Sequence, residues 1–232
     1  MDSPAYLSYL CRELGSFRNC LSGDLAAPVE HCGDWTLLDL AEHLGAGNLW
    51  AAVAITEKHG DHQAEPAPRN DRDGFVSWFD ATCSQLLTAL NGNPDSAAWT
   101  IYPPHTVGFW QRRRCMETVT HRWDAEHALG APQTIEPELA SDGVAEVLEV
   151  MAPRQVALER TQAPEHSVRL VASDTDASWV YGPGDPVATL TATAETLFLT
   201  LWGRRTPSTE AACTWEGNQE AGQALLRNSL VP

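Results

Sequence analysis

The sequence predicts a mixed fold, α plus α/β, in which a helical bundle precedes a small α+β domain. Apolar residues recur at helical spacing in the first part of the chain, and loops rich in Pro, Gly and polar residues interrupt that spacing. Near residue 155 the spacing changes to the alternation that is typical of β-strands. We therefore expect a helical domain over 1–155 and an α+β domain over 156–232.

Four long helices are predicted in the first part of the chain. Thr36 can cap the second of them, and Asp39 can complete a capping box three residues later. The expected helices cover 4–22, 36–58, 72–91 and 109–129. Because polar loops join them, they predict a four-helix bundle, in which sites are built from side chains on facing helices.

In the second part of the chain, segments with helical spacing of apolar residues are followed by segments with the alternation of strands. A shorter helical stretch is expected over 142–158. Segments rich in Val, Thr and aromatic residues predict strands over 166–173, 177–184 and 186–192. Helical spacing returns over 193–205, and a last strand and a last helix are expected over 212–217 and 218–230.

The composition restricts the class of partner and the location. The chain has 15 Lys and Arg against 31 Asp and Glu, a formal net charge of −16. Such a field repels phosphate backbones and anionic lipids, so we expect neither nucleic acid nor a membrane as partner. The N-terminal residues lack the pattern of a signal peptide, and the six cysteines form no C-x-x-C pair. We therefore expect a cytoplasmic protein whose cysteines are buried thiols.

Two of the eight histidines follow an acidic residue by four positions, the spacing that places two side chains on one helix face. They are His43, which follows Asp39, and His121, which follows Glu117. The first pair lies on the second predicted helix and the second pair on the fourth. If these helices face each other in the bundle, the two pairs can meet.

Two imidazoles and a carboxylate form a donor set that binds Zn²⁺ and other first-row divalent ions. His43, Glu117 and His121 are therefore a candidate metal site with positions left open for water or substrate. Asp39 is expected to hold the second nitrogen of His43, and Asp124 that of His121. The alternative is an ordinary helix-surface pair at each place, worth about 0.2–0.5 kcal/mol.

We expect the remaining histidines not to bind metal and the basic run to lie on the surface. His31 and His127, like the other four histidines, are expected to be solvated or off the ligand face. The run Arg112–Arg114 is expected to be a solvated helix start, with attraction of a carboxylated substrate as the alternative.

Three stretches together resemble the mycothiol-dependent maleylpyruvate isomerase family, part of the wider DinB-like group of metal-binding four-helix bundles. They are "DWTLLDLAEHLGAGNLWAA", "RRRCMETVTHRWDAEHALG" and "LFLTLWGRR". The resemblance covers nearly the whole chain. It implies a DinB-like bundle followed by a C-terminal α+β domain that is similar to sterol-carrier-like units.

The resemblance also implies roles for particular residues. It implies a divalent metal, first of all zinc, held by His43, Glu117 and His121, and mycothiol, a small thiol, as cosubstrate. Arg204 matches the place where the family presents an arginine to the active site. The ordinary interpretation of "WGRR" is a helix C-terminus with favourable cations.

These implications define the function hypotheses. The leading one is a metal-dependent and mycothiol-dependent S-transferase, in which a metal-bound thiolate attacks a small electrophilic or thiol-conjugated substrate. The alternatives are mycothiol-dependent cis–trans isomerisation of maleylpyruvate, hydrolysis by metal-activated water, and a non-catalytic metal-binding bundle. The expected partners are a small-molecule thiol and a small-molecule substrate.

Overall fold

The computed structural model describes residues 1–207, 213–228 and 230–232. Its contacts divide the chain into two compact units, Met1–Gln133 and Thr134–Pro232. This division lies earlier than the boundary expected between residues 155 and 156. The reason is that α5 (Pro137–Glu146) packs against α7 (Ala194–Leu201) and therefore belongs to the second unit.

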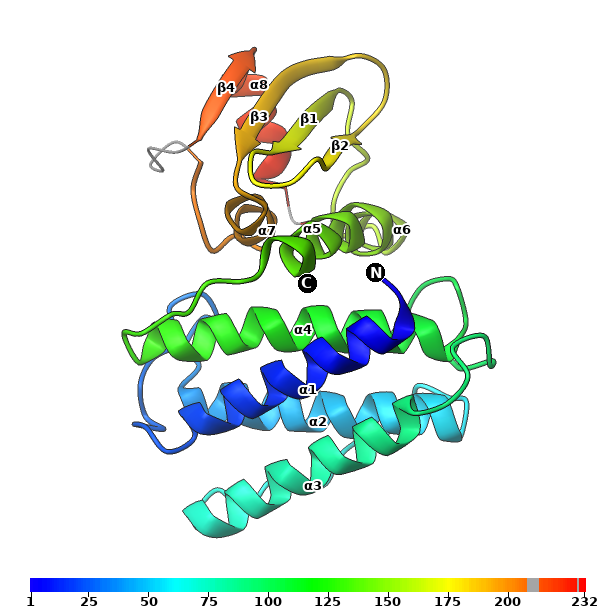
Figure 1. The fold of residues 1–232 in the computed structure, drawn as a ribbon, viewed down its shortest axis with the longest axis vertical. Coiled ribbons are helices and arrows are strands. Elements are labelled where there is room, and N and C mark those ends of the chain that lie inside the picture. Colours follow the sequence, from blue (N-terminus) through cyan, green and yellow to red (C-terminus); the bar gives the residue numbers. More distant parts are fainter. Residues whose placement is uncertain (208–212, 229) are drawn as a thin grey trace. The chain divides into compact units, whose positions relative to one another are not determined.

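The first unit is the predicted four-helix bundle (Figure 1). Its helices are α1 (Ser3–Cys20), α2 (Leu37–Thr56), α3 (Arg72–Leu90) and α4 (Val107–Ala128). Helix α1 packs on α4, and α2 packs on both α3 and α4. The core between them is apolar and includes the fully buried side chains of Leu10, Phe17, Leu40, Leu44, Phe79 and Val119. The position of α2 against α4 is the one that a site shared by these helices requires.

The helix starts agree with the capping chemistry of the sequence. Thr36 accepts a hydrogen bond from the backbone N–H of Asp39, and the Asp39 carboxylate accepts one from the backbone N–H of Thr36. The predicted capping box is therefore confirmed. Thr106 caps α4 in the same way through the N–H of Phe109.

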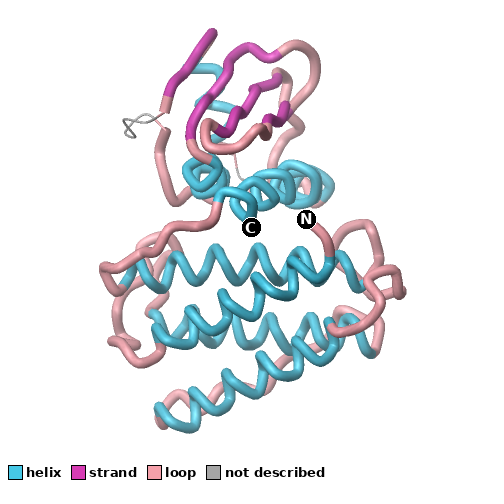
Figure 2. The backbone as a smooth tube through the Cα atoms, viewed as in Figure 1, coloured by secondary structure: helices cyan, strands magenta, loops and turns pink. Residues whose placement is uncertain are grey.

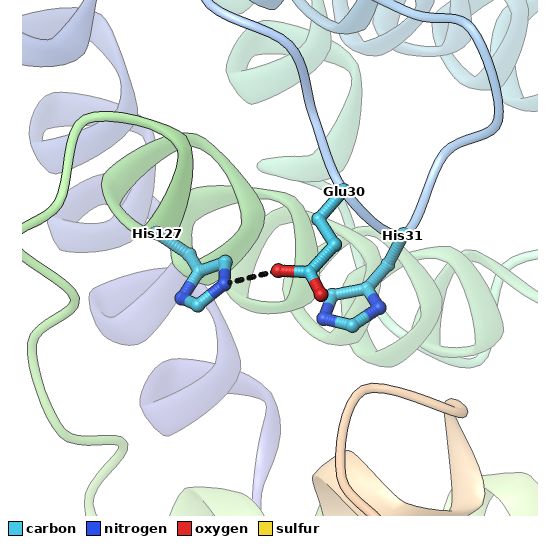
Figure 3. A group of neighbouring side chains, drawn as sticks. All are labelled: Glu30, His31 and His127. Carbon is cyan, nitrogen blue, oxygen red and sulfur yellow. Dashed lines mark hydrogen bonds and ion pairs between the residues drawn. The ribbon is translucent and has the colours of Figure 1, made fainter.

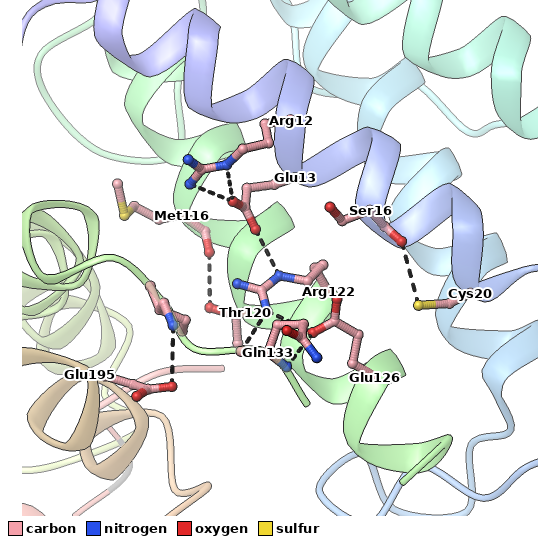
Figure 4. Close-up of polar contacts among 11 residues, drawn as sticks. Arg12, Glu13, Ser16, Cys20, Met116, Thr120, Arg122, Glu126, Gln133 and Glu195 are labelled. Carbon is pink, nitrogen blue, oxygen red and sulfur yellow. Dashed lines mark hydrogen bonds and ion pairs between the residues drawn. The ribbon is translucent and has the colours of Figure 1, made fainter. Parts of the chain in front are cut away.

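A network of buried charges joins α1 to α4 (Figure 4). The Arg122 guanidinium on α4 donates to Glu13 on α1 at 2.8 Å and to Glu126 at 2.7 Å. It also donates to the carbonyl of Gln133 at 2.8 Å. The pair of Arg122 with Glu13 is buried on both sides and links α4 to α1, whereas Glu126 satisfies the same guanidinium from within α4.

The loop between α1 and α2 is a compact turn. Pro28 and Thr36 form an antiparallel bridge, and the N–H of Val29 donates to the carbonyl of Trp35 at 2.8 Å. Gly33 at the turn has a φ of 64°, in the left-handed region that glycine adopts without strain. We call residues 27–36 the α1–α2 turn, and its side chains contact the candidate site described below.

The second unit is a four-stranded sheet with helices (Figure 2). Its strands are β1 (Ser167–Ala172), β2 (Ser178–Tyr181), β3 (Pro186–Ala192) and β4 (Thr214–Gly217), in the order β2-β1-β3-β4. The central pair β1–β3 is parallel, and the two outer pairs are antiparallel. Besides α5 and α7, the helices are a π-helical turn (Val147–Met151), α6 (Ala152–Ala157) and α8 (Gln219–Leu226).

The expected fold class is confirmed, a helical unit followed by a small α+β unit. The helical stretch expected from residue 142 begins earlier because Pro137 occupies the first turn of α5, where its fixed φ suits a helix. Positions 212 and 229, within the expected last strand and last helix, lie outside the described residues. Across the part of the chain that the structure describes, no helix combines the length and apolarity that a membrane crossing requires.

Candidate metal centre

Three predicted ligands come together from α2 and α4. His43 Nε2 lies 3.3 Å from Glu117 Oε1, and His121 Nε2 lies 3.5 Å from the same oxygen. One donor atom from each residue lies within 4.8 Å of the other two. The structure therefore brings together the three side chains that the sequence analysis selected.

The spacing of these donor atoms suits a small divalent ion. A tetrahedral ion with ligands at about 2.1 Å holds each pair of ligand atoms about 3.4 Å apart. The two distances from Glu117 Oε1, 3.3 and 3.5 Å, match that separation. Two imidazoles and one carboxylate also leave coordination positions open. The residues present thus fit the metal that the resemblance implies.

The exposure of the three side chains falls steadily across the centre. The side chain of His43 is 43% exposed, that of Glu117 20% and that of His121 7%. The indole of Trp35 lies beside His43, with the ring centroids 4.9 Å apart. The centre is therefore closed at His121 and open at His43, where a substrate can approach.

Asp124 orients His121 as expected. Its Oδ2 lies 3.0 Å from His121 Nδ1, and its carboxylate is fully buried. This contact turns Nε2 of His121 towards Glu117. The thiol of Cys32, in the α1–α2 turn, donates to the same Asp124 oxygen at 3.8 Å. No local pattern around Cys32 indicates this contact, because the two residues meet only in the folded bundle.

Asp39 does not take the role expected for it. Its carboxylate accepts hydrogen bonds from Thr36 and from the guanidinium of Arg69, instead of holding His43. The capping box directs the Asp39 side chain towards the start of α2, and Arg69 reaches it from the loop that precedes α3. The expectation that Asp39 holds His43 is therefore corrected. An acidic residue one turn before a histidine can either contact that histidine or cap the start of the helix, and Asp39 caps the helix.

In the basic run before Glu117, Arg113 and Arg114 are buried and Arg112 is partly exposed, which corrects the expectation of a solvated helix start. Arg113 donates to Glu117 Oε2 at 2.7 Å. Arg114 donates across the bundle to the carbonyl of Leu44 and to Asn48 Oδ1. Gly47 makes room for this crossing, because a Cβ there would lie 2.9 Å from Arg114 Nη1. The arginines thus hold Glu117 and join α4 to α2.

The charges around the centre shift two pKa values. Burial alone would raise the pKa of Glu117, but Arg113, His121 and His43 hold it well below its usual range. Burial would lower the pKa of His121, but Asp124, Cys32 and Glu117 raise it to about 10. His121 thus has an acceptor at each nitrogen, and an ion that binds Nε2 must displace a proton from it.

Arg204 follows α7 in the second unit. Its guanidinium donates to the carbonyl of Trp202 at 2.7 Å and lies 5.7 Å from the Trp202 ring centroid. It also lines a cavity of about 490 Å³ within that unit, together with Arg205 and Arg227. The role that the resemblance implies for Arg204 at the metal centre stays a prediction.

The first unit is thus a four-helix bundle in which two histidines and a glutamate converge from two helices as a candidate metal site. The chain belongs to the mycothiol maleylpyruvate isomerase family. The N-terminal domain of that family matches residues 7–126, and its C-terminal domain matches residues 138–223. The two matches fall one in each compact unit of the structure.

Individual proteins and solved structures are also similar to this chain. Two curated relatives are uncharacterized proteins from two strains of Mycobacterium tuberculosis; each is 28% identical over 144 residues, which is 59% of this chain and 71% of the relative. The crystal structure of the mycothiol-dependent maleylpyruvate isomerase has a TM-score of 0.70 at 16% identity, covering 94% of this chain and 95% of the isomerase. A histidine-to-alanine mutant of that enzyme matches with the same TM-score at 15% identity. At these identities the two structures establish the shared fold.

Proposed function

We propose that the protein is a metal-dependent cis–trans isomerase that uses mycothiol and acts on maleylpyruvate or a similar conjugated cis acid. The observation that carries the proposal is the spacing of His43, Glu117 and His121, whose donor atoms are placed for a divalent ion with open positions. Family membership supports mycothiol as the thiol and isomerisation as the reaction. It favours the isomerase alternative over the broader S-transferase hypothesis.

The residues around the centre have distinct tasks. A divalent ion held by His43, Glu117 and His121 would stabilise the thiolate form of a bound thiol, the form that is nucleophilic. Arg113 and Asp124 keep Glu117 and His121 in their positions. Trp35 flanks the open side at His43 with an aromatic surface.

The isomerisation needs a nucleophile and an orienting group. The thiolate adds to one carbon of the conjugated double bond, and the electron pair moves to the carbonyl oxygen. The former double bond then rotates, the carbonyl re-forms, and the thiolate leaves, so thiol and protons are conserved. A cation that binds the substrate carboxylate would hold the acid during this rotation, and Arg204 is the proposed residue for it.

The test is an assay of the zinc-loaded protein with mycothiol and maleylpyruvate, which follows conversion to the trans isomer. We expect turnover that requires both thiol and metal and that is lost in His43→Ala. His59→Ala is the matched control, because His59 is another exposed histidine paired with a glutamate, Glu57, at 3.1 Å. It should retain full activity.

The other hypotheses predict different results in the same experiment. A stable conjugate of mycothiol with an added electrophile, without isomerisation, would support the S-transferase. Turnover without thiol would support a hydrolase. Zinc binding without any of these activities would leave the non-catalytic bundle, and a protein that binds no metal would overturn the proposal.

A further inference from the structure

A second group of potential metal ligands lies outside the candidate centre (Figure 3). Glu30 and His31 belong to the α1–α2 turn, and His127 lies in the last turn of α4. His127 Nε2 lies 2.9 Å from Glu30 Oε2, and one donor atom from each of the three residues lies within 4.8 Å of the others. We propose that Glu30, His31 and His127 form a second divalent metal site, which fastens the α1–α2 turn to α4.

The donor set suits the same ions as the candidate centre. Two imidazole nitrogens and a carboxylate oxygen bind zinc and its neighbours in the first transition row. Neither histidine has an acidic residue four positions away, so the helical spacing that identified His43 and His121 does not identify this group. The fold brings both histidines together with Glu30, a grouping that the sequence analysis did not indicate.

Aromatic stacking holds the two imidazoles in place. The ring of His127 stacks on the indole of Trp123, with centroids 4.8 Å apart and planes only 8° from parallel. The ring of His31 lies 5.7 Å from that of His127 and 6.0 Å from the indole. Trp123 is buried in the bundle, so it is a fixed platform for both rings. Ligands that are already oriented lose less conformational entropy when an ion binds.

The group is accessible and can adjust to an ion. The Glu30 side chain is 68% exposed and that of His127 is 36% exposed, so an ion can enter from solvent. Ligand atoms of a tetrahedral ion stand about 3.4 Å apart, slightly farther than the 2.9 Å between Glu30 and His127. A small rotation of the exposed Glu30 side chain supplies that difference. The net charge of −16 also favours the approach of cations.

The proposed site is separate from the candidate centre, although both use α4. His127 follows His121 by six residues, which is about 9 Å along a helix. Asp124 lies between His121 and His127 on α4, and Cys32 follows His31 in the α1–α2 turn. These two residues contact each other and so separate the second group from the candidate centre. An ion at Glu30, His31 and His127 would therefore hold the turn that carries Cys32 and Trp35 without occupying the centre that those residues border.

The experiment counts bound zinc. The full chain is dialysed against buffered Zn²⁺, and its zinc content is measured by elemental analysis for the parent, His127→Gln and His59→Gln. His59 pairs with Glu57, but among the described residues no third candidate ligand joins that pair. We expect His127→Gln to bind one equivalent fewer than the parent and His59→Gln to bind as much as the parent.

The variant His43→Ala tests the second metal site independently of the proposed function. In His43→Ala the candidate centre is disrupted, and zinc should still raise the thermal midpoint of unfolding. That rise should disappear in the double variant His43→Ala/His127→Gln. If His127→Gln stays folded by circular dichroism and keeps the parental zinc content, the second site is refuted. Loss of zinc in His43→Ala alone bears only on the first centre.

Discussion

Asp124 shows how a single residue can determine the properties of the candidate centre without contacting an ion. It is fully buried, its oxygen lies 3.0 Å from His121 Nδ1, and Cys32 donates to the same oxygen. Its negative charge makes His121 more basic and directs the free nitrogen towards Glu117. The strength of metal binding should therefore depend on this carboxylate.

The change Asp124→Asn tests that dependence. An amide has nearly the same shape but no charge, so we expect zinc affinity to fall about 10- to 100-fold. A competition titration against a chelator of known affinity measures the change. Asp73→Asn, at an exposed position of α3, is the matched control and should leave the affinity unaltered. Equal affinities for the parent and Asp124→Asn would show that His121 does not need this partner.

Arg204 is the second residue whose role can be isolated. If it orients the substrate carboxylate, Arg204→Gln should lower kcat/KM about 10- to 100-fold, since a hydrogen bond between charged groups is lost. The zinc content should not change, because the three predicted ligands lie in the other unit.

The control for Arg204 is its neighbour. Arg205→Gln removes a guanidinium that donates to Thr196 Oγ1 within the second unit, and it should retain the parental kcat/KM. If Arg205→Gln lowers kcat/KM and Arg204→Gln does not, Arg205 is the residue that orients the substrate carboxylate. Steady-state kinetics on both variants decides between them.

At the scale of the element, the start of α2 depends on Asp39. Its carboxylate accepts from Thr36 and Arg69, and these hydrogen bonds lower its pKa to about 2. Asp39→Ala should therefore lower the free energy of unfolding by about 1 kcal/mol at neutral pH, as loss of a helix cap does. Asp71→Ala is the control, because Asp71 precedes α3 but makes no side-chain capping bond.

The effect of Asp39→Ala should depend on pH in a defined direction. The pKa of this carboxyl in the unfolded chain is about 3.9, and in the folded chain it is lower. The stabilisation is therefore complete above pH of about 4 and is lost as the pH falls through about 2. Urea unfolding of parent and variant across this range should give curves that converge at the acid end. A constant difference would show that the charge of Asp39 is not responsible.

Replacing a glycine of α5 by alanine tests how tightly α5 packs against α7. A Cβ at Gly143 in α5 would lie 2.5 Å from the ring of Phe198, which is fully buried in α7. Gly143→Ala should therefore destabilise the protein by about 1–3 kcal/mol, the usual cost of overpacking, less the gain in helix propensity. Gly15→Ala is the matched control in α1, where nothing lies within 4 Å of the added Cβ.

The two glycine variants should have opposite signs. Gly15→Ala should raise the free energy of unfolding by up to about 1 kcal/mol, since alanine favours the helix more than glycine does. Thermal or denaturant unfolding measures both changes. A Gly143→Ala variant as stable as the parent would mean that Phe198 can move aside.

Sequence patterns predict elements and helix faces well, and they fail where partners come from distant segments. The i,i+4 spacing of Glu117 and His121 is a local property, so it predicts that the two side chains share one face of α4. The pairing of Asp39 with Arg69 and that of Glu30 with His127 join residues that only the fold brings near. No local spacing contains that information.

Helix α4 illustrates a second limit of sequence patterns. An amphipathic helix reveals one buried face, but α4 contacts α1, α2 and α3 and is buried on nearly every side. Arg113, Arg114 and Arg122 are therefore interior residues, although a basic run on a helix is normally solvated. The burial of Arg113 and Arg114 follows from the central place of the helix, which the sequence does not display.

At the scale of the whole molecule, both family domains are present and each has its own core. The donor atoms for metal lie wholly in the first unit, whereas Arg204 lies in the second. The proposed metal binding therefore depends on residues of the first unit, and the proposed role of Arg204 is a part of the chemistry that depends on a residue of the second. Zinc content and turnover report on these two parts separately.

The buried bonds of Arg122 have a consequence for the rate at which metal exchanges. Arg122 is the neighbour of His121 in sequence, so α4 cannot turn His121 away from the centre without withdrawing Arg122 from Glu13 on α1 and from the carbonyl of Gln133. Glu117 lies on the same helix and is held by Arg113. His43 is thus the ligand that can swing aside most easily, and an ion should both arrive and depart past its imidazole. A chelator should remove the ion at a rate set by the mobility of His43, while α4 stays in place.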